Sequence, residues 1–263
     1  MVHTSDGTVE RDRAVLVQDG RITRIAAAGS ITPPDSARRP DVAGAWVTPG
    51  LFDMHVHMRG FEAEDYVRAG ITTVRNMWGY STLAALVDSI ENGDRIGPRI
   101  HSLSSGLDGP PVYWPETQLI TDPSQADSVV GAMQAAGYSE VKVYEDLAPA
   151  VYDSIVAATV RRGMTHAGHK PDQVSVERVI RSGQRSIEHL GGLMGRSRGE
   201  LDRLIALSVE HGTWHSPTLA VLLAPPDDVV GRAARRDVVA ALHAGGARLL
   251  IGVLAAQGFR TVV

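Results

Sequence analysis

The sequence of 263 residues contains no cysteine. Disulfide bonds, thiolate metal ligands and cysteine nucleophiles are therefore excluded, and any metal chemistry must use histidine, a carboxylate or a modified lysine. The chain also lacks an apolar run near the roughly 18 residues that a membrane-spanning helix needs. Its N-terminal segment, MVHTSDGTVERDR, has no basic start followed by an apolar stretch, which a secretory signal needs. We therefore expect a cytoplasmic protein with no membrane partner.

Lysine is nearly absent, because the 26 basic residues include only Lys142 and Lys170 as lysines. The formal net charge of -4 and the lack of a basic block argue against nucleic acid as a partner. Arginine supplies almost all of the positive charge. A lysine that is kept within an apolar strand therefore indicates a task that a guanidinium group cannot perform.

The pattern that is present along the chain predicts an α/β fold in two domains. Residues 1–46 contain two alternating runs around an Asp19-Gly20 hairpin signal, AVLVQDGRITRIA, and predict a small β module. In residues 47–263, strand-like and helix-like segments alternate, and the length suits a (β/α)8 TIM-type barrel of about 250 residues. Residues 104–119 show no periodicity and predict a long loop. The expected strands lie near residues 51–57, 71–75, 99–103, 139–144, 163–168, 185–189, 213–216 and 248–252.

The segment VTPGLFDMHVHM, residues 47–58, places two histidines two positions apart at the end of an apolar run. Alternate residues of a strand share a face, so His55 and His57 lie on one side, and the apolar side chains on the other predict a strand that is buried on both faces. Two neutral imidazoles roughly 7 Å apart along a strand can converge on a metal at its C-terminal end, where parallel α/β folds keep their sites. A lone histidine there would favour an ordinary core residue, whereas the pair favours metal ligands.

Lys142 lies between two valines in the expected strand EVKVY, with Tyr144 on the same face. Burial lowers the pKa of a lysine and favours its neutral amine. A neutral amine can react with carbon dioxide to give a carbamate, whose two oxygens can bridge two metal ions. The alternative is a lysine that extends to the rim of the fold and keeps its charge in water.

Further histidines lie near the C-terminal ends of expected strands: His166 and His169 in MTHAGHKPD, and His189 in RSIEHL. A lone histidine at such a place is more often a core residue that bonds to backbone. The recurrence of histidine on several strands favours a shared site instead. His215, at the seventh expected strand, is interpreted as a structural or pocket-lining residue.

Four segments together resemble the amidohydrolase superfamily, in its imidazolonepropionase-like and Xaa-Pro dipeptidase-like (prolidase-like) branch: PGLFDMHVH, VKVYEDL, AGHKPDQVSVERVIRSGQRSIEHL and GTWHSPTL. The resemblance covers nearly the whole chain. It implies a pair of divalent metal ions, zinc in the first place, with manganese, iron or cobalt as alternatives. His169 is preferred to His166 because Gly-His-x-Pro resembles the family's motif on strand five. The implied ligands are His55, His57, Lys142 as a carbamate derived from carbon dioxide, His169 and His189.

The end of the chain departs from this resemblance. The family closes its eighth strand with Gly-Thr-Asp, whereas this chain has Gly252-Val253-Leu254 and no acidic residue after Asp237. Only a short segment follows the eighth expected strand. We therefore expect a truncated copy: a barrel without its last helix, and an N-terminal module that is part of an incomplete β-sandwich. Uncovered edges of this kind favour a homo-oligomer.

The residues and the resemblance predict a metal-dependent hydrolase of C–N bonds in amides or small peptides. The expected substrate is a small molecule or a dipeptide-like compound, the expected nucleophile is a metal-activated hydroxide, and Tyr144 is expected to donate a hydrogen bond to the developing oxyanion. Leu254 can neither bind a metal nor accept a proton, so impaired activity is expected. The alternatives are a lactone or phosphotriester hydrolase of the same superfamily and a non-catalytic, metal-binding remnant.

Overall fold

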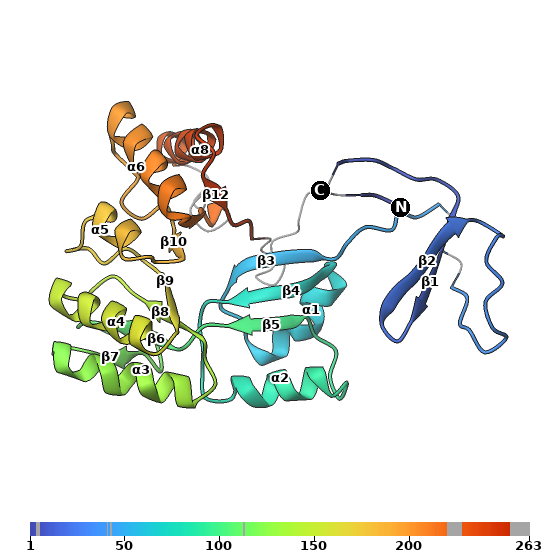
Figure 1. Ribbon diagram of the computed structural model, residues 1–263, viewed down its shortest axis with the longest axis horizontal. Helices are drawn as coiled ribbons and strands as arrows, with labels where there is room; N and C mark the ends of the chain where they lie inside the picture. The colour runs from blue at the N-terminus through green and yellow to red at the C-terminus, as the bar shows by residue number, and fades with distance from the viewer. Residues whose placement is uncertain (4–5, 41, 43, 113, 220–227, 253–263) are drawn as a thin grey trace. The chain divides into compact units, whose positions relative to one another are not determined.

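The computed structural model describes residues 1–3, 6–40, 42, 44–112, 114–219 and 228–252 of the chain. The chain divides into two compact units, Met1–Gly50 and Leu51–Val263 (Figure 1). All of the residues expected to hold metal lie in the second unit, whereas Leu254 lies outside the described residues.

The first unit is built around a β-hairpin. β1 (Arg13–Gln18) and β2 (Arg21–Ala27) pair antiparallel across a two-residue turn. Asp19 and Gly20 in this turn have φ angles of 49° and 71°, the left-handed values that a type I′ turn needs. In the described part of this unit, one isolated antiparallel bridge accompanies the hairpin. The β-sandwich therefore stays a prediction.

The second unit is an α/β structure with parallel sheets, as the sequence predicts. One sheet has the order β3-β4-β5 and the other has the order β12-β11-β10-β9-β8-β6-β7. The strands pair in parallel throughout the described parts of both sheets. The expected strands are all present, as β3 (Leu51–Val56), β4 (Ile71–Asn76), β5 (Arg99–Ser102), β8 (Glu140–Val143), β9 (Thr165–Gly168), β10 (Ser186–Glu188), β11 (Trp214–Ser216) and β12 (Arg248–Leu249).

The interpretation of residues 104–119 as a loop alone was wrong. Two short strands lie there, β6 (Gly106–Asp108) and β7 (Gln118–Leu119), and β6 pairs with β8. Strands of two or three residues are too short to show the alternation that sequence reasoning detects. Gly106 is needed because a Cβ there would lie 2.7 Å from the ring of Tyr144 and 3.1 Å from that of Trp78.

Backbone hydrogen bonds also cross between the two sheets. Just after β5, the amide of Ser104 donates to the carbonyl of Glu140 at the start of β8, at 3.1 Å. Just after β12, the carbonyl of Ile251 accepts from the amide of Met54 in β3, at 3.3 Å. The three-stranded sheet is therefore joined to the other sheet by a backbone hydrogen bond at each of its two ends, near β8 and near β12.

Several of the described helices between the strands begin at capping signals. The described helices are α1 (Ala63–Arg68), α2 (Leu83–Glu91), α3 (Ala126–Ala135), α4 (Pro149–Arg161), α5 (Val176–Arg181), α6 (Arg198–His211) and α8 (Val229–Ala244), with 3-10 turns η1 (Gly60–Glu62) and η2 (Pro123–Gln125). Ser197 and Glu200 form a reciprocal capping box at α6, and Pro149 occupies the first position of α4. None of the described helices is long and apolar enough to cross a membrane.

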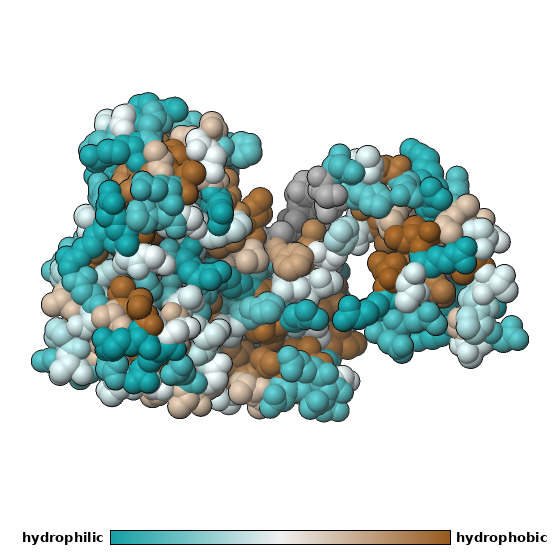
Figure 2. All heavy atoms as spheres, in the orientation of Figure 1, coloured by the Kyte–Doolittle hydropathy of each residue, from teal (hydrophilic) through white to brown (hydrophobic). Residues whose placement is uncertain are grey.

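The helices bury their apolar sides against the strands. The larger buried cluster joins strand residues such as Val141 and Ile187 to helix residues such as Ile155, Leu204 and Leu242. A second cluster joins β3 and β4 to α1 and α2, which lie beside them in Figure 1. On the face shown in Figure 2, hydrophilic side chains cover much of this unit, and hydrophobic ones lie between them in smaller patches.

The prediction that β3 is buried on both faces was wrong for the first part of the strand. Leu51 and Phe52 are 47% and 55% exposed, whereas Asp53 and Val56 are buried. The apolar cluster of this sheet includes Val56 and the following Met58, but neither of the first two residues. The helix that follows the strand therefore covers its C-terminal part, where the histidines are.

Candidate functional site

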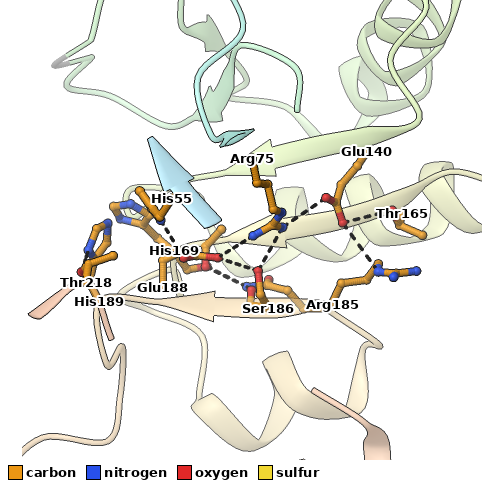
Figure 3. A network of polar contacts seen from close by, with 12 residues as sticks. His55, Arg75, Glu140, Thr165, His169, Arg185, Ser186, Glu188, His189 and Thr218 are labelled. Atoms are coloured by element: carbon orange, nitrogen blue, oxygen red, sulfur yellow. Dashed lines mark hydrogen bonds and ion pairs between the residues drawn. The ribbon is translucent and has the colours of Figure 1, made fainter. Parts of the chain in front are cut away.

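Four of the predicted histidines come together at the C-terminal ends of β3, β9 and β10. The ring centroids of His55 and His57 are 5.5 Å apart, and the ring of His55 lies 4.7 Å from that of His189. The ring of His169 also lies 4.7 Å from that of His189. The structure thus groups these four rings, three of which are labelled in Figure 3.

Lys142 reaches the same place from β8. Its side chain is fully buried, its Nζ has no hydrogen-bond partner, and Nζ lies 5.0 Å from the centroid of the Tyr144 ring. Burial lowers the pKa of Lys142 from 10.5 to about 7, so a neutral amine is accessible near neutral pH. Gly168 provides room for this side chain, because a Cβ there would lie 3.1 Å from Lys142 Cδ.

The rings are held mainly through their Nδ1 atoms. His55 Nδ1 lies 2.7 Å from Glu188 Oε2, and His189 Nδ1 lies 2.6 Å from Thr218 Oγ1. His169 Nδ1 lies 2.8 Å from Glu145 Oε1, a close contact that lacks hydrogen-bond geometry. Nδ1 contacts of this kind leave the opposite ring nitrogen, Nε2, for a metal ion.

Burial keeps these imidazoles neutral, which is the form that binds metal. It lowers the pKa of both His57 and His189 to about 2, and the charge of a protonated Lys142 acts in the same direction. The pKa values of His55 and His169 are also lowered, again chiefly by burial. His57 Nε2 is buried without a hydrogen-bond partner.

His166, the alternative on β9, points away from this group. Its Nε2 lies 3.2 Å from Ser182 Oγ, its Nδ1 lies 3.5 Å from Thr159 Oγ1, and its ring packs near Tyr152. These partners belong to α4 and to the end of α5. The geometry therefore groups His169, and not His166, with the other three rings.

His215 is likewise buried away from the four rings. Its Nε2 lies 3.0 Å from Ser208 Oγ on α6. This contact agrees with the structural alternative for His215.

Sequence reasoning missed the carboxylate that supports the group. Glu188 is fully buried beside the four rings, with Arg75 Nη1 donating to its Oε1 at 3.3 Å (Figure 3). Burial opposes its ionisation, but His55, Lys142 and Arg75 hold the pKa of Glu188 well below its usual value. The available signals were a glutamate directly before His189 and an arginine inside the apolar strand ITTVRN.

Aromatic rings form one wall of the site. The Trp78 ring lies 5.9 Å from His57 and 5.8 Å from Tyr144, and the Trp114 ring lies 5.3 Å from His57. Tyr144 in turn lies 4.4 Å from the His169 ring, and its hydroxyl is buried without a hydrogen-bond partner. Trp114 is 45% exposed and is therefore accessible from outside.

The grouped side chains include donors that a divalent metal binds, but they do not form a complete metal site. In the described part of the chain, no three histidine, aspartate or glutamate side chains have the arrangement of a metal site. The four neutral rings, the partnerless His57 Nε2 and the partnerless Lys142 Nζ are nevertheless buried polar groups that a metal and a carbamate would satisfy. The donor types present therefore fit a divalent metal.

A separate cavity of about 410 Å³ is lined by none of the four grouped histidines. Its lining combines residues at or just before the starts of β8, β9 and β10, such as Glu140, Thr165 and Arg185, with residues of β5 and the side chain of Arg75.

Comparison with known proteins gives relatives and a shared fold. No family model matches the chain. A dihydroorotase of Syntrophus aciditrophicus (strain SB) is 26% identical over 254 residues, 94% of this chain and 52% of that protein. An imidazolonepropionase of Ralstonia nicotianae is 36% identical over 118 residues, 38% of this chain and 27% of that protein. The chain thus spans about half the length, or less, of these relatives.

Solved structures give a likeness over almost the whole chain. A prolidase complexed with N-methylphosphonate-L-proline superposes with a TM-score of 0.72 at 17% identity, over 95% of this chain and 76% of that one. At this identity the likeness shows a common fold.

Proposed function

We propose that this chain, whose relatives and structural neighbours support its membership of the amidohydrolase superfamily, is a metal-dependent hydrolase of C–N bonds in amides or small peptides. The observation that carries the proposal is the grouping of four neutral histidines around a buried lysine. Structural histidines instead bond singly to side chains of neighbouring helices, as His166 and His215 do here.

The two sheets of the second unit are proposed to be arcs of one (β/α)8 barrel. The hydrogen bonds from Ser104 to Glu140 and from Met54 to Ile251 support closure at the two gaps. Closure would place the C-terminal ends of all the strands around one mouth, where active sites of such barrels lie.

The residues that would hold two divalent ions, zinc in the first place, are His55, His57, His169, His189 and Lys142 as its carbamate. A bound metal pair would supply an activated water at neutral pH and polarise the scissile carbonyl. Lys142 would form the carbamate when its neutral amine attacks carbon dioxide and releases a proton. Its lowered pKa favours this reaction near pH 7.

Tyr144 and the aromatic wall would act on the substrate directly. The buried Tyr144 hydroxyl would donate a hydrogen bond to the carbonyl oxygen as negative charge develops there. Trp78 and the half-exposed Trp114 favour a substrate with an apolar or ring-bearing group. Lys170 is not available to bind a substrate carboxylate, because its Nζ donates to three backbone carbonyls.

The direct test is metal content together with turnover. We would measure zinc, manganese and cobalt per chain, and hydrolysis of Xaa-Pro dipeptides and N-acyl amino acids, with a lactone and a phosphotriester in the same panel. The Lys142→Ala variant should lose bound metal and regain some with added acetate, which can replace the carbamate. Lys170→Ala, which removes the other lysine, is the matched control and should keep its metal.

The outcomes separate the alternatives. Turnover of the lactone or phosphotriester alone would identify the other hydrolase class. Metal binding without turnover would favour the non-catalytic remnant. A wild-type chain that binds no metal, or a Lys142→Ala variant that binds as well as wild type, would contradict the proposed site.

A further inference from the structure

We propose that Arg75 is a positioning residue for the candidate metal site, and that it acts by holding the Glu188 carboxylate against the ring of His55. The inference rests on the proposed function, because it concerns how a proposed ligand is oriented. Arg75 itself contacts none of the four histidines through a hydrogen bond or ion pair among the described residues.

Arg75 extends from β4 into the interior between β8 and β10 (Figure 3). Its side chain is only 11% exposed. Nη1 donates to Glu188 Oε1 at 3.3 Å, and Nη2 donates to Ser186 Oγ at 3.1 Å. A guanidinium group presents its donors in a planar fork, so these contacts fix the direction of the carboxylate as well as compensating its charge.

The two oxygens of Glu188 have separate tasks. Oε1 accepts from Arg75 and from the hydroxyl of Ser186, whereas Oε2 contacts His55 Nδ1 at 2.7 Å. The glutamate side chain has no solvent exposure. Without Arg75 it would be a buried carboxylate that had lost the one of its partners that always carries a positive charge, and its side chain would be free to move away from His55.

The contact with Glu188 decides which nitrogen of His55 faces the other rings. An ionised carboxylate only accepts hydrogen bonds, so His55 must carry its proton on Nδ1 and leave the Nε2 lone pair for a metal. His189 has no such constraint, because its Nδ1 partner is the Thr218 hydroxyl, which can donate or accept. Arg75 thus influences the site through the tautomer and orientation of one ring.

Arg75 also provides an internal control, because it bonds a second carboxylate. Nη2 lies 3.1 Å from Glu140 Oε2, and Glu140 is further held by Thr165 Oγ1 at 3.2 Å and Arg185 Nε at 3.9 Å. Glu140 begins β8 and lines the cavity at the strand starts, away from His55. If Arg75 only stabilised the core, the loss of either carboxylate partner would have the same effect on the His55 tautomer and on zinc affinity.

The experiment compares Arg75→Met, Glu188→Gln, Glu140→Gln and the double variant Arg75→Met/Glu188→Gln. The first readout is the tautomer of His55 in metal-free protein, from long-range ¹⁵N NMR of the imidazoles, with His55→Gln to assign the signal. The second is zinc affinity, from competition with a chromophoric chelator. We expect Arg75→Met and Glu188→Gln each to lose the single Nδ1-protonated form and to bind zinc about 10- to 100-fold more weakly.

Two further results are expected. Glu140→Gln should keep the wild-type tautomer and zinc affinity. The double variant should bind zinc no more weakly than Glu188→Gln alone, because Arg75 acts through Glu188.

An unchanged His55 tautomer in Arg75→Met would overturn the inference. A loss of zinc affinity in Glu140→Gln as large as that in Arg75→Met would also overturn it. If Arg75→Met does not fold, Arg75→Lys, which keeps the charge without the fork, and Glu188→Gln decide the same question. If the wild type binds no zinc, the proposed function fails, while the tautomer measurement still tests Arg75.

Discussion

Glu188 Oε2 lies 2.7 Å from His55 Nδ1, although 133 positions separate the two residues in the sequence. The contact joins the C-terminal ends of two strands, because His55 lies one residue before the end of β3 and Glu188 is the last residue of β10. The contact also explains how a carboxylate can be fully buried in an apolar core: it gains a fixed hydrogen bond for each oxygen. The candidate site is therefore supported from within the core and not only from the loops.

The two histidines of β9 should respond differently to substitution. We expect His169→Gln to weaken zinc binding, measured by chelator competition, because its ring lies among the other three. His166→Gln should leave zinc affinity unchanged and lower the free energy of unfolding by roughly 1–3 kcal/mol, because it disturbs buried hydrogen bonds to Ser182 and Thr159. The opposite pattern would show that His166 is the ligand.

The stability of the metal-free protein should rise with pH above 7. Lys142 has a folded pKa of about 7 against 10.5 when exposed, so between these values the unfolded chain binds more protons than the folded one. The free energy of unfolding therefore increases through this group by up to about 1.4 kcal/mol per pH unit in that window, and this gain is lost as the pH falls to 7. Urea unfolding of wild type and Lys142→Met in carbon dioxide-free buffers measures it. Parallel curves for the two proteins from pH 7.5 to 10 would contradict this account.

The strands could be predicted well because the side chains along most of them show a local pattern that is typical of a strand. The alternation around His55 and His57 and the valines flanking Lys142 indicate strands without knowledge of their neighbours. β6 could not be predicted, because three residues carry no period and its pairing with β8 is decided by tertiary contacts. The same holds for the contact between Arg75 and Glu188, which lie 113 positions apart in the sequence.

The aromatic wall should set substrate preference. Trp114→Ala should raise KM for substrates with an apolar acyl or ring-bearing group by up to about tenfold, the equivalent of an aromatic contact of roughly 0.5–1.5 kcal/mol. KM for a small acetylated substrate should change less, and kcat should change little for either. Trp114→Phe keeps an aromatic face and should restore most of the preference. An equal change for both substrates would argue that Trp114 shapes the loop and does not touch the substrate.

Leu254→Asp should increase turnover, because the resemblance implies an aspartate that takes a proton from the attacking hydroxide at the end of strand eight. Gly252, the last described residue, lies against Asp53, since a Cβ there would be 2.5 Å from Asp53 Oδ1. The described end of this segment therefore reaches β3, which carries His55 and is followed directly by His57. Loss of a positioned acid-base group costs about 10² to 10⁴ in rate, so we expect a gain of that order in kcat, with a smaller gain in metal affinity. Leu254→Asn, which cannot exchange the proton, is the control and should not increase kcat. A wild-type kcat near 10 per second, typical of enzymes, would show that another group performs the proton transfer and that this substitution is not needed.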